Sequence, residues 1–135
     1  MKKTIAVVLT IFMMIGISGA SFAALPIDYT PQWTNIMSIV SSLGFSGNHG
    51  GATASVDGKP GTTKVEATLT VYKQSGGAWV YVDSDSDSTT TEEYVALSVN
   101  FDGISGVYYK AEFKVSVTRN GITESTTKTS YKTCP

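Results

Sequence analysis

The sequence predicts an all-β fold: a single antiparallel β-sandwich of immunoglobulin-like type with about seven strands, preceded by a signal peptide that is cleaved. Apolar and polar residues alternate in several short segments, and alternation at period two places one face of a strand in a core and the other in water. These segments recur about every ten residues, with glycine-rich turns between them. Beyond the first 23 residues no segment has a convincing helical pattern, which favours a sandwich over a mixed fold.

The first 23 residues have the order of a secretory signal peptide. Lys2 and Lys3 precede an apolar run over residues 5–17, and small residues follow up to Ala23. We expect cleavage after Ala23, with Ala20 as the alternative position. The apolar run is shorter than the roughly 20 residues that a membrane span needs, so an uncleaved anchor is the weaker hypothesis.

Cleavage would leave 112 residues, close to the commonest size of one domain. The expected parts are a signal peptide over 1–23, an extended N-terminal lead-in over 24–34 and the immunoglobulin-like sandwich domain over 35–135. Within the lead-in, Trp33 either folds back onto the sandwich or belongs to a loosely held arm.

Four strands are expected before residue 90. In the first, Met37, Ile39, Leu43 and Phe45 share one parity, although this region also fits helical spacing. The inward positions of the second and third are expected to be Ala52, Ala54, Val56, Val65, Ala67, Leu69 and Val71. The fourth is the aromatic segment 79–82, which follows a glycine turn and is expected to close one end of the core.

Three more strands follow. Their expected inward residues are Val95, Leu97, Val99, Phe101, Tyr109, Ala111, Phe113, Val115 and Val117. The segment that starts at Tyr109 is expected to be the central strand. It ends at Asn120-Gly121, which favours a type I′ turn into a partner over 122–131. Tyr109 also follows a glycine corner, where a tyrosine hydroxyl of immunoglobulin folds bonds back to the corner.

Three segments resemble a known family: TTK…TLTVYK…W (Thr62 to Trp79), GVYYKAE and RNGITES…TKT. They are similar to a family of short secreted proteins from Gram-positive bacteria with no assigned activity. The resemblance covers most of the mature chain and implies export and a β-sandwich. It brings no catalytic residues.

The sequence favours a protein that is not an enzyme. His49 is the only histidine and lies in a glycine-rich loop, and no Gly-x-Ser-x-Gly elbow accompanies it. The scattered carboxylates form no pair marked out by an aromatic sugar platform. We therefore expect no catalytic residues and no cofactor.

The run from Asp83 to Glu93 offers the one candidate metal site. Asp83, Asp85 and Asp87 alternate along the chain, and hard cations such as Ca²⁺ prefer several converging carboxylates. An EF-hand is excluded because serine and tyrosine occupy its glycine and glutamate positions. A looser Ca²⁺ site, completed by Glu92 or Glu93, is one hypothesis, and a solvated mobile loop is the other.

Cys134 is the only cysteine and stands next to the last residue. In an oxidising exterior it has no partner within the chain. Three hypotheses remain: an exposed free thiol, an intermolecular disulfide giving a weak dimer, or a thiol packed against a neighbouring strand. Near the chain end we expect the thiol to be accessible.

The expected function is that of a secreted, non-catalytic binding or interaction module, whose partner is an extracellular protein or glycan. Without Lys2 and Lys3 the chain carries 8 basic and 11 acidic residues, a net charge of about −3, which provides no basic face for nucleic acid or an anionic membrane. No sorting motif is present at the C-terminus, so release is favoured over covalent attachment to the cell surface. The alternatives are a secreted effector, such as a protease inhibitor or small antibacterial protein, and a Ca²⁺-binding structural module.

Overall fold

The computed structural model describes residues 33–135; the expected signal peptide and most of the expected lead-in lie outside these residues. The described part forms one compact unit, Trp33–Pro135. It contains seven strands: β1 (Ile36–Ser46), β2 (His49–Gly58), β3 (Thr62–Ser75), β4 (Ala78–Thr89), β5 (Tyr94–Asp102), β6 (Tyr108–Arg119) and β7 (Ile122–Thr133). The all-β prediction with seven strands is confirmed. Within these residues, no helix has the length and hydropathy needed to cross a membrane.

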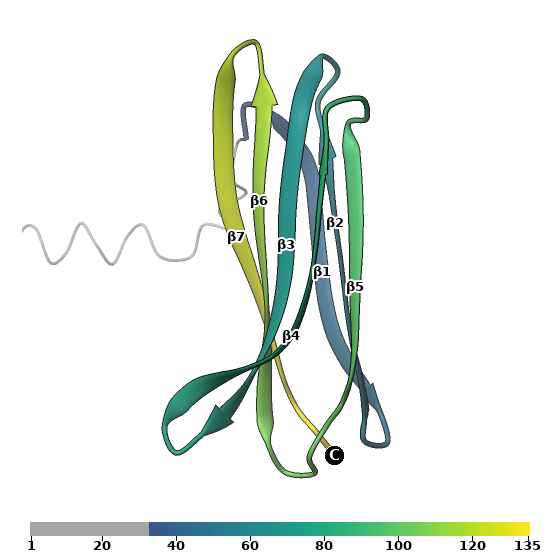
Figure 1. The fold of residues 1–135 in the computed structure, drawn as a ribbon, viewed down its shortest axis with the longest axis vertical. Helices are drawn as coiled ribbons and strands as arrows, with labels where there is room; N and C mark the ends of the chain where they lie inside the picture. The colour runs from purple at the N-terminus through teal and green to yellow at the C-terminus, as the bar shows by residue number, and fades with distance from the viewer. Residues whose placement is uncertain (1–32) are drawn as a thin grey trace, which may run out of the picture. The chain divides into compact units, whose positions relative to one another are not determined.

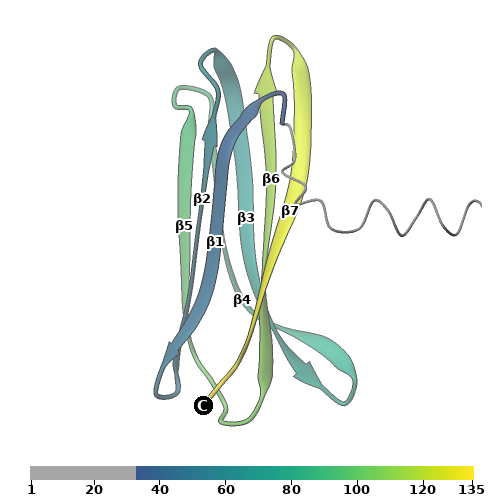
Figure 2. The ribbon, with the colours of Figure 1, turned by 180° about the vertical axis from the view of Figure 1, so that it is seen from behind.

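The strands form two antiparallel sheets. The smaller sheet has the order β1-β2-β5 and the larger the order β4-β3-β6-β7. The sheets face each other, with the core between them (Figures 1 and 2). β6, the expected central strand, lies inside the larger sheet and pairs with β3 on one side and β7 on the other.

The core consists of the apolar side chains that alternate with polar ones in the sequence. The predicted inward residues of β2, β3, β5 and β6 are buried, except Phe101, which is partly buried. Phe113 is 0% and Tyr109 1% exposed. Burial of these apolar side chains is the main contribution that stabilises the two-sheet arrangement.

The prediction for β1 is right about the strand and wrong about Met37. β1 pairs with β2, but its register shifts between Ile36 and Ser38. Such a bulge adds one residue on one strand and reverses the side-chain parity across it. Ile36 and Ile39 therefore both face the core, at 1% and 7% exposure, while Met37 is 52% exposed.

The turn and the corner that flank β6 agree with the sequence. Asn120 and Gly121 have φ angles of 53° and 74°, as both central residues of a type I′ turn require. At the other end, the Tyr109 hydroxyl accepts a hydrogen bond from the backbone N–H of Ile104 at 2.9 Å. The tyrosine hydroxyl is thus bonded to the corner that precedes its own strand.

The N-terminal end of the described chain is held against the larger sheet. The Glu124 carboxylate on β7 accepts hydrogen bonds from the consecutive backbone N–H groups of Thr34, Asn35 and Ile36, at 2.7, 2.9 and 3.0 Å. Trp33 packs partly buried against the core, and its carbonyl accepts a hydrogen bond from Lys59 Nζ. Of the two hypotheses for Trp33, the structure supports folding onto the sandwich.

Asn35 completes this attachment as the one buried polar residue among those described. Its side-chain amide donates to the carbonyls of Val117 and Ile122, at 3.0 and 2.7 Å. These carbonyls flank the β6–β7 turn. A buried polar group is tolerated when its hydrogen bonds are made, and Asn35 uses its own to tie the start of β1 to that hairpin.

The prediction of a loop from Asp83 to Glu93 is wrong for residues 83–89, and only residues 90–93 lie between strands. β4 continues through Thr89 and pairs with β3, with Asp83 opposite Val71, Asp85 opposite Leu69 and Asp87 opposite Ala67. Directly paired residues point to the same face, so the aspartates lie on the inner side of the sheet, along its edge. The Asp-Ser alternation has a period of two, which suits an edge strand with one inward and one outward row.

Candidate functional site

The outer face of the larger sheet offers an extended exposed surface. Paired residues of β3, β6 and β7 form rows across it: Tyr72, Lys110 and Tyr131; Thr70, Glu112 and Thr129; Thr68, Lys114 and Thr127; Glu66, Ser116 and Ser125; Lys64, Thr118 and Thr123. Same-face residues are about 7 Å apart along a strand, so the five rows extend over about 27 Å. Aromatic rings lie at one end, and hydroxyls and charges occupy the rest.

We call the residues at the aromatic end the aromatic cluster: Tyr72, Trp79, Tyr108, Lys110 and Tyr131. Tyr108 and Tyr131 are stacked, with centroids 5.7 Å apart and 15° between their planes. The Trp79 ring lies 5.8 Å from Tyr108 and 6.1 Å from Tyr131. Tyr108 and Tyr131 are 38% and 53% exposed, so their rings are both ordered against each other and open to solvent.

Lys110 joins the rings of the aromatic cluster through its charge. Its Nζ lies 4.6 Å from the Trp79 centroid and 5.0 Å from the Tyr72 centroid. Both distances are within the range of a cation–π interaction, in which the ammonium is attracted to the electron-rich face of the ring. The Lys110 side chain is 17% exposed, so its stem packs among the rings.

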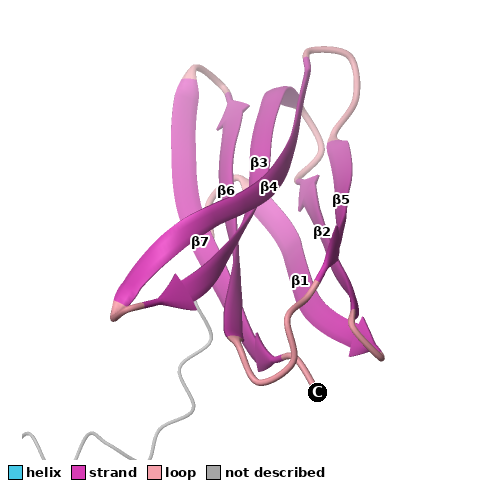
Figure 3. Ribbon diagram, turned by 60° about the horizontal axis from the view of Figure 1, so that its bottom comes forward, coloured by secondary structure: helices cyan, strands magenta, loops and turns pink. Residues whose placement is uncertain are grey.

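A bulge in the β3–β4 pairing brings Trp79 to the cluster. The register shifts between Val71 and Tyr72, and a bulge bends its strand and increases the local twist. Figures 1 and 3 show the end of this hairpin projecting across β6 and β7. Gly76 and Gly77 close the hairpin with φ angles of 58° and 80°. Trp79, which follows them, therefore contacts rings on β6 and β7.

The expectation that segment 79–82 closes one end of the core is wrong for its aromatic residues. Trp79 lies in the aromatic cluster and Tyr81 is 58% exposed. The rings against the core are instead Phe45, Phe101 and Tyr109, with centroids 5.2–5.6 Å apart. The bulge changes which residues of β4 face inward, and only Val82 of the segment packs against the core.

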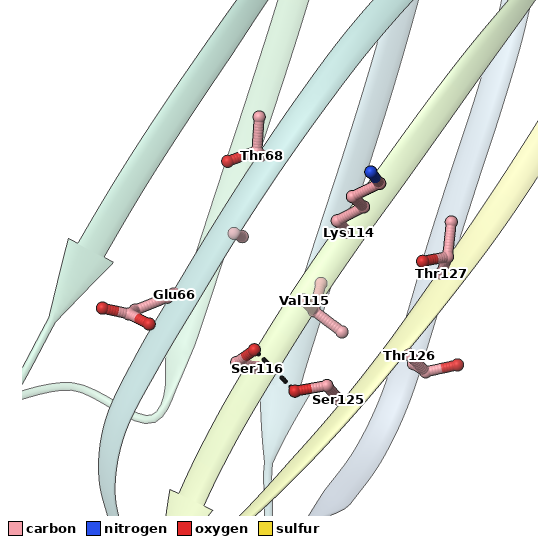
Figure 4. Close-up of a pocket in the computed structure, with 9 residues that line it drawn as sticks. Glu66, Thr68, Lys114, Val115, Ser116, Ser125, Thr126 and Thr127 are labelled. Atoms are coloured by element: carbon pink, nitrogen blue, oxygen red, sulfur yellow. Dashed lines mark hydrogen bonds between the residues drawn. The ribbon is translucent and has the colours of Figure 1, made fainter.

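A shallow groove of about 410 Å³ lies on the same outer face, beyond the aromatic cluster. Figure 4 shows its outward side chains: Glu66, Thr68, Lys114, Ser116, Ser125 and Thr127. The hydroxyls of Ser116 and Ser125 are 2.7 Å apart and hydrogen-bonded to each other. The groove is therefore lined by hydroxyls together with one acid and one base.

The charges of the outer face are paired. Glu112 lies between two lysines, 3.8 Å from Lys110 Nζ and 3.1 Å from Lys114 Nζ. Lys64 Nζ lies 2.8 Å from a Glu66 oxygen. Three lysines against two glutamates leave only a small local excess of positive charge, so this surface has no strong electrostatic preference for a charged ligand.

The candidate Ca²⁺ ligands Asp83, Asp85 and Asp87 do not converge. Successive members are about 7 Å apart along β4, whereas Ca²⁺ oxygens lie about 2.3–2.6 Å from the ion. The Asp85 carboxylate accepts the backbone N–H of Ser98 on β5, at 3.2 Å. Among residues 33–135, no three acidic, histidine or cysteine residues are grouped as a metal site requires, and Glu92 and Glu93 add none.

His49 lies at the start of β2 and faces Asp102 at the end of β5. Its Nδ1 is 3.3 Å from an Asp102 oxygen, and the two side chains are 80% and 83% exposed. An exposed pair of this kind contributes little to stability. The register sets His49 directly opposite Asp102, which explains the contact without a catalytic role.

The expectation that the Cys134 thiol is accessible is wrong. Cys134 is 1% exposed and belongs to the core cluster. Its backbone is held at both polar groups, with N–H donating to the carbonyl of Val107 and C=O accepting the N–H of Gly106. Of the three hypotheses for this cysteine, the structure supports the thiol packed against its neighbours. A disulfide to another chain would require this end of the fold to open.

Sequence reasoning missed the aromatic cluster, although part of its signal is present. Tyr108, Lys110 and Tyr72 occupy the outward parity of their strands, where exposed aromatic residues are notable. Tyr131 ends the range expected for the last strand, and the sequence pattern does not indicate which face it occupies. The missing information is the bulge that carries Trp79 across the sheet.

Comparisons with known proteins add no family. No protein-family model matches the chain, and no curated protein matches it. Among solved structures, the chain is similar to the crystal structure of Spo0M, a sporulation control protein from Bacillus subtilis, with a TM-score of 0.35 and 13% sequence identity. The match covers 67% of this chain and 46% of Spo0M, so the chain spans less than half of that protein's length. A likeness at this level carries no argument about function.

Proposed function

We propose that this protein is a secreted, non-catalytic binding module of immunoglobulin-like type that uses the outer face of its larger sheet. The observation that carries the proposal is the aromatic cluster. Tyrosine and tryptophan contribute much to binding when their rings are available to a partner. Here they lie ordered on an exposed face, while a separate set of rings fills the core.

Two features support the immunoglobulin-like assignment. β1, β2 and β5 form one sheet and β3, β6 and β7 belong to the other, which is the division of strands A, B, E and C, F, G in immunoglobulin domains. β4 joins the sheet of β3. The hydrogen bond from Ile104 N–H to the Tyr109 hydroxyl corresponds to the tyrosine corner of these domains.

Secretion rests on the leader, with its two lysines, apolar run and small residues before Ala23. The expectation that the protein is not an enzyme stays a prediction. Within residues 33–135 the single histidine faces only Asp102 among acidic residues, on an open surface. These points together favour a protein that acts outside the cell by contact.

A cell-association assay tests the proposal. Protein purified without residues 1–23, which lie outside the compact unit Trp33–Pro135, is incubated with intact Gram-positive cells and sedimented with them. We expect retention that is weakened by Tyr131→Ala on the outer face. Tyr94→Ala is the matched control, since Tyr94 is 51% exposed on β5 of the smaller sheet. No retention, or equal retention of all three proteins, would contradict the proposal.

A further inference from the structure

We infer that the ligand of the outer face is a neutral polysaccharide chain, laid across the aromatic cluster and along the hydroxyl-lined groove. This inference rests on the proposed binding function and names the chemical class of the ligand. Three properties of the surface lead to it: its flat and open shape, its balanced charge and its mixture of aromatic rings with hydroxyls.

The shape favours a long ligand over a small one. Small-molecule sites enclose most of their ligand in a concave pocket. The outer face instead presents Tyr81, Tyr108 and Tyr131 at 58%, 38% and 53% exposure, and its groove is shallow. Rows of side chains continue for about 27 Å along the strands, a length suited to several sugar units.

The charge of the outer face favours a neutral ligand over a polyanion. Lys110 and Lys114 are paired with Glu112, and Lys64 with Glu66. A surface that binds nucleic acid or another polyanion presents unpaired cations in a field of one sign. Here Lys110 and Lys114 share Glu112, and Lys64 pairs with Glu66, so little unpaired positive charge is left to attract a polyanion.

The composition and area distinguish a glycan from a protein partner. The exposed rings of Tyr81, Tyr108 and Tyr131 offer about 300 Å², so a protein partner that covers roughly 800 Å² would also have to bury the polar rows beyond them. Those rows consist of six threonines, two serines, two lysines and two glutamates, and serine, lysine and glutamate are depleted from protein interfaces.

Sugar rings match both parts of this surface. The C–H face of a pyranose ring is apolar and weakly positive, so it stacks on the electron-rich face of an aromatic ring. Its hydroxyl groups lie at the ring edge and exchange hydrogen bonds with side chains such as Thr127 and Ser116. The tyrosine hydroxyls of Tyr108 and Tyr131 add donors and acceptors beside the stacked rings.

The test is sedimentation of the protein with insoluble cellulose, chitin, xylan and granular starch, with heparin-agarose as the polyanion. We expect retention by at least one of the four neutral polysaccharides and competition by soluble oligosaccharides of the same sugar. Tyr131→Ala should weaken retention about tenfold or more, whereas Tyr94→Ala should not. Thermal unfolding of each variant shows whether it is folded, and Trp79→Ala serves as a second cluster variant.

The outcomes separate this inference from the proposed function. Retention by none of the four polysaccharides, retention by heparin-agarose alone, or equal retention of Tyr131→Ala and Tyr94→Ala overturns the polysaccharide inference. If cells still retain the protein in a Tyr131-dependent manner after these failures, the binding module stands with a different ligand. If protease treatment of the cells abolishes that retention, the ligand is a protein.

Discussion

Glu124 is the residue whose ionisation is most closely linked to the fold. Partial burial raises the pKa of the Glu124 carboxyl. The backbone N–H groups of Thr34, Asn35 and Ile36, together with the charge of Lys59, lower this pKa by a larger amount. The pKa in the folded state therefore lies below the ordinary value. A charged acceptor that satisfies three backbone donors holds the start of β1 against β7.

Glu124→Gln should lower the melting midpoint at neutral pH by an amount equivalent to about 1–2 kcal/mol on this partly exposed group. The glutamine amide keeps one acceptor oxygen, so at least one of the three N–H groups loses its acceptor and the remaining hydrogen bonds are no longer charge-assisted. The depressed folded pKa makes the ionic contribution fully present above the unfolded pKa. It is lost as pH falls through the folded value. Melting curves from pH 7 to pH 3 should show the difference between wild type and variant shrinking at the acid end.

Glu66→Gln is the control for this pH dependence. Glu66 is exposed and contacts only Lys64 among the charged residues near it, so its loss should change the midpoint little at any pH. A difference between wild type and Glu124→Gln that stays constant down to pH 3 would show that the Glu124 charge does not hold the N-terminal segment.

At the scale of the element, β6 carries the core on one face and the candidate ligand surface on the other. Phe113→Ala should cost about 3–5 kcal/mol, since it removes a fully buried ring and leaves a cavity. That is a large part of a typical total stability of about 5–15 kcal/mol. Lys114→Ala, one residue further and exposed, should change the midpoint little. Similar losses for the two variants in thermal unfolding would refute the assigned faces of β6.

We interpret the aspartates of β4 as protection for the edge of the larger sheet. An edge strand with unpaired N–H and C=O groups is a template for pairing with another chain, and inward-pointing charges prevent this. Asp85 fits that role because it also caps the backbone N–H of Ser98 on the opposite edge strand β5. The acidic run is thus explained by the position of β4 in the sheet order.

Asp85→Ser should make the protein more prone to self-association, because it frees the Ser98 N–H and removes a charge from the open edge. Light scattering over a concentration series measures the effect. Glu66→Gln is the control, since it removes one negative charge from β3, an interior strand of the same sheet. Equal association of both variants would mean that net charge, and not the edge, is responsible.

The positions of the strands were predictable, while their irregularities were not. Period-two alternation locates the buried rows of β2, β3, β5 and β6, and Asn120-Gly121 locates a turn, because these signals are local. The bulges near Met37 and Val82 depend on pairing with another strand. The local sequence therefore does not indicate that the inward and outward side chains exchange places there. The low β-propensity of the Asp-Ser run was likewise overridden by its pairing with β3.

At the scale of the whole molecule, the proposed binding outside the cell requires export. Mass spectrometry of culture supernatant should detect a mature chain that begins Ala24-Leu25-Pro26, because Ala23 and Ser21 are the small residues that signal peptidase accepts. Detection of the intact chain, still carrying Met1, in the membrane fraction would contradict export as a cleaved protein.

The candidate site belongs to the whole molecule as well, because its rings come from all four strands of the larger sheet. The sequence separates Tyr72 and Tyr131 by nearly half of the chain, and only the order β4-β3-β6-β7 brings them within one surface. The burial of Cys134 likewise depends on contacts that the sequence does not reveal. Its place near the chain end suggested exposure, whereas its contacts with the corner around Gly106 and Val107 bury it.

The proposed function requires the aromatic cluster to lie outside the core, on a surface free to bind. Acrylamide quenching of Trp79 fluorescence, measured in a Trp33→Phe background so that one tryptophan remains, tests it most directly. We predict that the folded protein shows ready quenching by acrylamide and that Tyr131→Ala, by removing a neighbouring ring, increases it. Blue-shifted emission that resists quenching until the protein unfolds would place Trp79 in the core and contradict the account.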